Sequence, residues 1–333
     1  MIGLAVLLVG AGIVFFYKSK PPAEMPGVAA VALPANSWYN NSLWSYVSGS
    51  PSVRQILRKN EEANGKTPSL ETARTFSFSG KMFSAVGTCF EQACIDQEKS
   101  RMIEQQRHTA QQFRLPNAGT KYVEEVNKPE NSDRYDNLGF SELGKLELLV
   151  KLPDMMLKKA TAIDRSDESH RRIEVSEFFN GMEGRRITDY FDALDNKVKS
   201  EVALMDAQQV ETARLEQASL LGKDFDHYKD MQFRGLEKVN DRVAFTVTAT
   251  NPKGEPEKFF FDAVTGFLIK LDTPLNSVYF DNYRAWGQGK FPYTVYVRQS
   301  EPGGFYSWIK IEIAEWKIGD VIEDSVFEIP AGA

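Results

Sequence analysis

Few residues of this chain are spaced for catalysis or metal binding. The three histidines, His108, His170 and His227, lie far apart in the sequence, and none has an H-E-x-x-H or i,i+4 partner. No G-x-S-x-G, Walker A or G-x-G-x-x-G motif occurs. The carboxylates are intermixed with lysines and arginines, as on a solvated surface. We therefore expect a protein that is not an enzyme and that has no catalytic residue, metal or cofactor.

The two cysteines, Cys89 and Cys94, have a C-x4-C spacing. On a regular helix, residues five apart lie about 140° around the axis, so the two thiols could bond only in a loop or a broken helix. They form a disulfide if the domain is exported, or they remain two thiols. The spacing excludes the usual thioredoxin-like and c-type haem motifs.

The first twenty residues predict a transmembrane anchor. The stretch from Ile2 to Tyr17 is apolar and Lys18 and Lys20 follow it. As a helix it would span about 24 Å, which suffices for a layer of roughly 30 Å if the lysines snorkel. A basic n-region is missing and the only A-x-A sequence lies well beyond the lysines, which favours an uncleaved anchor over a signal peptide.

Residues 21–49 are expected to be a tether. Residues 21–35 are rich in proline and alanine, and a cluster of aromatic residues follows. Such aromatics suit a lipid headgroup layer or a protein interface, and a lid packed on the domain is an equal alternative. The residues expected to contact the membrane or a partner are Phe15, Phe16, Tyr17, Trp38, Tyr39, Trp44 and Tyr46.

Length and charge limit the remaining classes of protein. A chain of 333 residues with 42% hydrophobic content can form one large β domain or two smaller ones. A net charge of −6 argues against nucleic-acid binding, because neutralising phosphates requires a basic face. We therefore expect no nucleic-acid partner.

The pattern along residues 50–330 predicts a mainly β fold with helices. A short helix begins at Ser50 or Ser52 and ends at Gly65, and residues 75–86 alternate as a strand. Residues 87–140 are expected to be a helical and irregular insert. Residues 196–221 are expected to form the longest helix, packed on the sheet. From Met231 onward the sequence reads as an antiparallel meander of strands joined by tight turns.

The segment FFFDAVTGFLIKLD, residues 259–272, predicts a hairpin with apolar residues on both faces. Asp262 can accept hydrogen bonds from the turn, and Gly266 can adopt the left-handed conformation that the turn needs. A strand pair this apolar must have both faces covered. One face of the hairpin packs on the protein's own core. The other face needs a second partner, which could be a ligand.

These C-terminal segments resemble the LolA-like outer-membrane lipoprotein carrier and sorting family. The resemblance rests on FFFDAVTGFLIKLD, VYFDNYRAWGQGKFPYTVYVR, WIKIEIAEWKI and the closing DSVFEIPAG. It is clearest from about Met231 to Pro330 and looser from Ser50. It implies a bent antiparallel half-barrel that wraps helices and whose apolar concave face holds acyl chains. It also implies a bacterial inner-membrane protein with its domain in the periplasm, whereas Lys18 and Lys20 favour the opposite orientation.

The function expected from these observations is binding of a lipid, acyl chain or lipoprotein in the half-barrel of a membrane-anchored protein. The alternative is a non-catalytic docking subunit of a larger membrane complex with integral membrane partners. Packing of the sheet against its own helix would explain the same apolar residues. The candidate ligand-binding residues are Phe245, Val247, Phe259, Phe261, Phe267, Ile269, Phe280, Ile309, Ile311 and Ile313.

Overall fold

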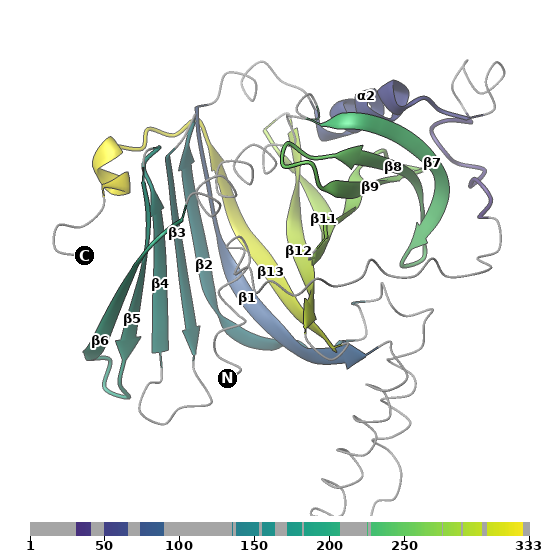
Figure 1. Cartoon of the computed structure of the whole chain (residues 1–333). Helices are drawn as coiled ribbons and strands as arrows, with labels where there is room; N and C mark the ends of the chain where they lie inside the picture. Colours follow the sequence, from purple (N-terminus) through teal and green to yellow (C-terminus); the bar gives the residue numbers. More distant parts are fainter. Residues whose placement is uncertain are drawn as a thin grey trace, which may run out of the picture.

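The computed structural model describes residues 31–40, 50–65, 74–89, 135, 138–152, 155–163, 172–181, 183–206, 225, 228–274, 276–287, 289–301 and 305–328. Its strands form one thirteen-stranded sheet with the order β6-β5-β4-β3-β2-β1-β13-β12-β11-β10-β9-β8-β7 (Figure 1). Every neighbouring pair is antiparallel. The strands are β1 (Thr75–Cys89), β2 (Ser141–Lys151), β3 (Met155–Ile163), β4 (Arg172–Phe179), β5 (Gly184–Phe191), β6 (Lys197–Leu204), β7 (Lys229–Val239), β8 (Arg242–Thr250), β9 (Pro256–Asp262), β10 (Leu268–Asp272), β11 (Asn276–Trp286), β12 (Gly289–Glu301) and β13 (Phe305–Ile318).

The chain enters this sheet at its centre and fills it in two passes. From β1 it moves outward strand by strand to the β6 edge, and it resumes at the opposite edge with β7. It then returns inward to β13, which pairs with β1 and joins the two halves. Because β6 and β7 are both edge strands, the sheet is not closed. The meander expected from residue 231 onward is thus confirmed as β7 to β13, and the mainly β, half-barrel architecture is also confirmed.

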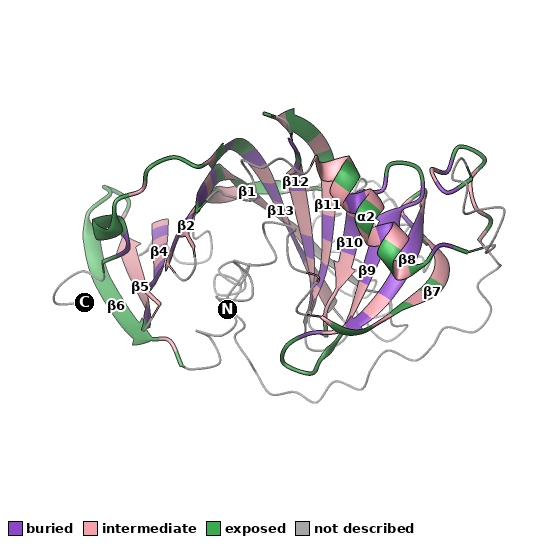
Figure 2. Ribbon diagram, turned by 90° about the horizontal axis from the view of Figure 1, so that it is seen from above, coloured by how far each residue is buried: buried purple, intermediate pink, exposed green. Residues whose placement is uncertain are grey.

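The sheet is strongly bent around its centre (Figure 2). Glycine permits close strand contacts there: a Cβ atom on Gly80 would lie 2.4 Å from the Glu312 carbonyl oxygen, and one on Gly144 would lie 1.6 Å from that of Thr161. Register shifts interrupt β1 at Ser79/Gly80 and at Met82/Phe83. Bulges of this kind bend a strand and increase its twist. The bend gives the sheet a concave and a convex face.

The helices with described bounds are α2 (Val53–Asn64) and the short 3-10 helix η4 (Asp324–Phe327). The α2 helix begins with a capping box in which Ser52 and Gln55 exchange hydrogen bonds, and it ends at Gly65 with φ of 74°. Both ends agree with the sequence prediction. No described helix is long and apolar enough to span a bilayer. Residues 1–30, which include the expected anchor, are outside the described ranges.

The prediction of a helix at residues 196–221 is wrong for the first part of this range. Residues 197–204 are β6, paired antiparallel with β5. From Lys199 onward the segment alternates with period two, so Ser200 and Val202 share one face while Lys199 and Glu201 share the other. An available neighbour strand therefore decided between two local readings. Most of residues 205–221 lies outside the described part of the chain, as do residues 90–134 of the insert expected at 87–140, whereas residues 87–89 of that insert belong to β1.

Candidate functional site

The strand registers define which side chains share a face of the sheet. Residues that oppose each other in an antiparallel ladder point to the same side. Ile311 opposes Met82 on β1 and Val295 on β12, which places all three on one face. The same relation, followed from strand to strand, brings Leu148, Phe78 and Val297 onto that face with Phe259 and Val247. This is the concave face, because η4 and the C-terminal segment pack outside the bend (Figures 1 and 2).

The structure gathers eight of the ten candidate ligand-binding residues on the concave face. Seven of them are buried and Phe280 is half-buried. The eight are Phe245, Val247, Phe259, Phe261, Phe280, Ile309, Ile311 and Ile313. The seven buried residues are divided between two clusters, one around β8 and β9 and one around β13.

The other two candidates, Phe267 and Ile269, belong to the convex side, which corrects the prediction for them. Phe267 stacks on Tyr283 with ring centroids 4.1 Å apart, and Ile269 packs in the cluster of Tyr279 and Trp308. The β9–β10 register shifts between Leu268 and Lys270. That irregularity breaks the simple alternation on which the prediction depended.

The β9–β10 hairpin itself has the predicted turn. Gly266 has a φ of 83°, and Asp262 Oδ1 accepts hydrogen bonds from the backbone amides of Val264 and Thr265 at 2.9 and 2.6 Å. Burial would raise the pKa of Asp262, but these hydrogen bonds and the Arg242 guanidinium, at 2.8 Å, hold it below its usual value. Phe259 and Phe261 pack on one face and Phe260 on the other. Both faces are therefore covered, as expected.

The β7–β9 half of the concave face is filled by the protein's own N-terminal segment. Tyr39 is 2% exposed, and Trp38 and Tyr39 pack on Phe245 with ring centroids 5.2 and 6.3 Å away. Ser37 Oγ donates a 2.7 Å hydrogen bond to the Ala263 carbonyl, and α2 adds the fully buried Ile56. Residues 31–40 therefore form a lid packed on the domain, which was one of the alternatives expected for the aromatic segment. Tyr39 is buried in the domain and cannot be a membrane contact, whereas Phe15, Phe16, Tyr17, Trp44 and Tyr46 are outside the described residues.

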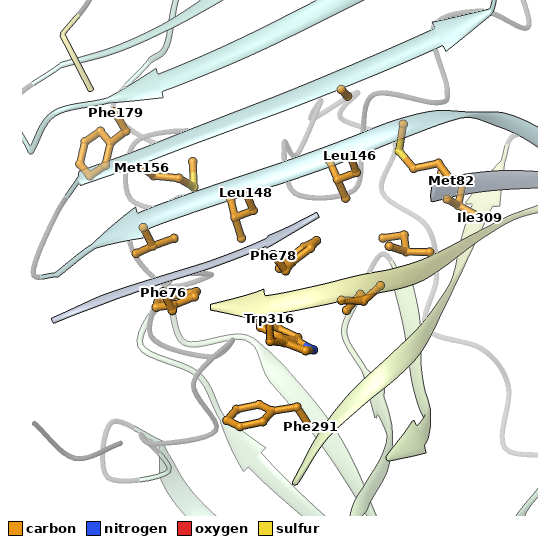
Figure 3. Packing of buried hydrophobic residues seen from close by; sticks show 14 residues of the cluster. Phe76, Phe78, Met82, Leu146, Leu148, Met156, Phe179, Phe291, Ile309 and Trp316 are labelled. Carbon is orange, nitrogen blue, oxygen red and sulfur yellow. The ribbon is translucent and has the colours of Figure 1, made fainter. Parts of the chain in front are cut away.

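The other half of the concave face carries an apolar cluster made from strand residues alone (Figure 3). We call it the central apolar patch, and it consists of Phe76, Phe78, Met82, Leu146, Leu148, Val150, Met156, Ala160, Phe179, Phe291, Ile309, Ile311, Ile313 and Trp316. Phe78 and Phe291 flank the Trp316 ring at 5.0 and 5.4 Å. The Trp316 Nε1–H donates to the Pro292 carbonyl at 3.1 Å, so the indole presents apolar surface. None of its buried members comes from a described helix or loop.

A charged group borders the central apolar patch. Lys158 opposes Leu148 on one side and Glu177 on the other, and Glu177 opposes Arg186. Lys158 Nζ is 3.2 Å from Glu177 Oε2, and Arg186 Nε donates to Glu177 Oε1 at 2.7 Å. Burial would raise the pKa of Glu177, but the two cations hold it below its usual value. The concave face therefore holds an ionised carboxylate between two cations.

The convex face of each half is closed by side chains of the described chain. Tyr135 stacks on Tyr296 at 3.8 Å between ring centroids and adjoins Trp308. On the β2–β4 half, Phe327 of η4 is 1% exposed and packs on Leu157 and Phe178. The central apolar patch differs from these surfaces because its cover is not among the described elements.

The described residues contain no candidate metal site, and they include only one of the two cysteines. Within the described ranges, no group of three or more histidine, cysteine and carboxylate residues could hold a metal ion. The three histidines and Cys94 lie outside those ranges, and Cys89 ends β1. The pairing of Cys89 with Cys94 therefore stays a prediction. The triad of Lys158, Glu177 and Arg186 was missed at the sequence level, because only the strand register brings the three together.

Comparison with known proteins gives two structural similarities. The chain is similar to a LolA superfamily protein from Nitrosomonas europaea, with a TM-score of 0.41 and 10% identity over 84% of this chain and 99% of that chain. It is also similar to a DUF1329 family protein from Desulfovibrio piger, with a TM-score of 0.37 and 10% identity over 84% and 98% of the two chains. No family model and no curated protein matches the sequence. With TM-scores this low, we take neither ligand nor activity from these neighbours.

Proposed function

We propose that this protein binds the acyl chain of a lipid or lipoprotein on the concave face of its open sheet. The central apolar patch is the observation that supports the proposal. It joins β1 to β4 with β12 and β13 in one apolar surface, and the described part of the lid, residues 31–40 with α2, packs on the other half of the concave face. The sequence resemblance to lipoprotein carriers implies the same class of ligand.

The energetics of such a ligand are favourable. Each buried methylene contributes about 0.8 kcal/mol, so burying a dozen would contribute about 10 kcal/mol. Association costs of about 4 kcal/mol or more oppose this gain. A long acyl chain would therefore bind well, whereas a short one would not.

The proposal includes the location expected from the sequence. The apolar segment 1–20 would anchor the protein in the bacterial inner membrane, and the domain would face the periplasm. A permanently tethered binding protein would receive or present its ligand at the membrane rather than carry it away. Reporter fusions at the C-terminus, one active only in the periplasm and one only in the cytoplasm, would test this orientation.

The binding proposal is tested on the full-length chain purified in a mild detergent. We expect native mass spectrometry to find co-purified lipid, and a fluorescent long-chain fatty acyl probe to bind and be displaced by unlabelled lipid. Ala160→Phe would obstruct the patch and weaken probe binding severalfold. Thr161→Phe, the neighbour that points to the convex side, is the matched control. A wild-type chain that neither retains lipid nor binds the probe would exclude this function.

The second candidate, a docking subunit of a larger membrane complex, is favoured by the β6 edge. This strand is exposed along its whole length, and Val198, Val202 and Leu204 are 51%, 44% and 70% exposed. An edge strand offers unpaired backbone groups to another chain. Co-purification of stoichiometric protein subunits, lost on Val202→Lys substitution, would support this candidate over lipid binding.

A further inference from the structure

We infer that the β6 edge pairs with the β6 edge of a second copy of this chain, so that the protein forms a two-fold dimer with one continuous sheet. This inference goes beyond the proposed function and does not depend on acyl binding. It starts from the position of β6, which is the last strand on its side of the sheet and pairs with β5 alone among the described strands. All eight residues of β6 are exposed.

The backbone of β6 has a defined set of groups directed away from β5. The Met205 N–H donates to the Gly184 carbonyl at 2.8 Å. Hydrogen-bonded and non-hydrogen-bonded pairs alternate along an antiparallel ladder, and the β5–β6 register is unbroken over residues 199–204. Alternate residues of β6 therefore direct their amide and carbonyl groups to the open edge, and these residues are Ser200, Val202 and Leu204. Such a row of groups can form a further ladder.

The charges of β6 would disfavour most partner strands. The strand carries Lys197, Lys199 and Glu201. Natural proteins place such charges on edge strands to prevent unspecific pairing. A partner strand must therefore oppose Lys199 with an anion and Glu201 with a cation. A second copy of β6 meets this requirement when the two strands run antiparallel.

One register of the β6–β6 pair is favoured by its charges. If Ser200 lies on the two-fold axis, Lys199 of each copy opposes Glu201 of the other, at two equivalent places. This register also matches the backbone, because Ser200 directs its amide and carbonyl to the open edge. A register with Lys199 or Glu201 on the axis sets like charges against each other instead. Lys199 and Glu201 already form an ion pair within one strand, so the dimer would gather four alternating charges.

The same register would cover exposed apolar side chains. It sets Val198 opposite Val202 of the second copy, and these residues are 51% and 44% exposed in the single chain. Residues that oppose each other in a ladder point to the same side of the sheet. The concave faces of the two copies would therefore open to the same side, with two central apolar patches in one sheet.

The test is native mass spectrometry and analytical ultracentrifugation of the full-length chain in mild detergent. We expect a wild-type dimer. Lys199→Glu and Glu201→Lys, each alone, should raise the dimer Kd about tenfold or more, because both cross-strand contacts become repulsive. An equimolar mixture of the two variants should form a heterodimer, because every acidic position then opposes a basic one. Lys145→Glu, an equal change of charge at an exposed position of β2, is the matched control and should dimerise as wild type does.

Cysteine cross-linking tests the register. Ser200→Cys should form a disulfide between copies above the background of the natural cysteines, because directly opposed Cα atoms lie about 5.5 Å apart. Ala203→Cys should not, since the register places its two copies about 20 Å apart along the strands. Equal cross-linking of the two variants would contradict the register.

Rescue by mixing separates pairing from folding, since no contact within one chain could produce it. Both charge substitutions are at exposed positions, so each variant is expected to fold, which circular dichroism verifies. A wild-type chain that stays monomeric up to high micromolar concentration, single variants that dimerise as well as wild type, or a mixture that stays monomeric would each overturn the inference. A different protein bound at this edge would overturn it as well. Acyl binding is measured separately with the fluorescent probe, so failure of the dimer and failure of the proposed function are distinguishable.

Discussion

At the scale of single residues, Glu177 is a buried carboxylate held between two cations. It is 2% exposed and contacts both Lys158 and Arg186. A buried ion pair adds little net stability compared with an apolar replacement, but removing one partner leaves the other charge buried and unpaired. Glu177 therefore lowers the free-energy cost of burying two cations on a largely apolar face.

Glu177→Gln should lower the free energy of unfolding by about 3–5 kcal/mol, since two largely buried cations lose the negative charge of Glu177. Urea unfolding of the full-length chain in detergent measures the change. Glu174→Gln is the matched control on the same strand, because Glu174 faces the convex side in a partly exposed pair with Arg172. Its effect should stay below about 1 kcal/mol. Equal losses from the two variants would contradict the assigned role.

The same residue predicts a pH dependence. The folded pKa of Glu177 is below its ordinary value of 4.5, so its stabilising contribution is full above that value and is lost as the pH falls through the folded pKa. The difference in urea midpoint between wild type and Glu177→Gln should therefore be constant near neutral pH and shrink in acid. A difference that grows as the pH falls would refute this assignment.

At the scale of elements, α2 is fixed to the sheet by a buried polar contact in addition to the apolar packing of residues such as Ile56. The Asn60 side chain is 2% exposed and donates to the Gly266 carbonyl at 3.0 Å. A Cβ atom on Gly266 would lie 2.7 Å from Lys59 Cγ, so glycine serves both the turn conformation and the approach of the helix. The β9–β10 turn thereby positions α2.

Asn60→Ala should cost about 1–3 kcal/mol, because it leaves a buried carbonyl without its donor. Thermal or urea unfolding measures the loss, and Arg54→Ala, at an exposed position of the same helix, should change stability by less than about 0.5 kcal/mol. An Asn60→Ala protein as stable as wild type would show that apolar packing alone holds the helix.

At the scale of the whole molecule, the two halves of the concave face have different occupants. Residues 31–40 and α2 fill the half built by β7 to β9, and the central apolar patch occupies the half around β1. The join is the β1–β13 pairing, between strands at opposite ends of the domain sequence. Stability and ligand binding should therefore be separable by mutation.

Tyr39→Ala tests that separation. Loss of a fully buried aromatic ring should lower the free energy of unfolding by about 3 kcal/mol or more, while affinity for the acyl probe should stay near that of wild type under conditions where the variant is folded. Ala160→Phe should show the reverse pattern, with weaker binding and a smaller change in stability. If Tyr39→Ala abolished binding in the folded protein, the ligand would occupy the lid half instead.

Local sequence predicted the elements whose signals are contained in a few neighbouring residues. The cap at Ser52, the stop at Gly65, the turn at Asp262 to Gly266 and the final meander all agree with the structure. Residues 197–204 did not, because a sequence with both helical and alternating character is decided by an available strand partner. Lys158, Glu177 and Arg186 each looked like ordinary surface charges for the same reason.

Turns and periodicity act over a few residues, so the mainly β class, the order of the C-terminal strands and the apolar character of their surfaces could be predicted from sequence alone. The face that each side chain occupies could not, because it depends on the fold: a bulge of one residue reverses the alternation beyond it. The tertiary structure also decided which half of the concave face the protein fills with its own lid, and it assembled three separate charges into one group. Those outcomes depend on pairing between strands distant in sequence.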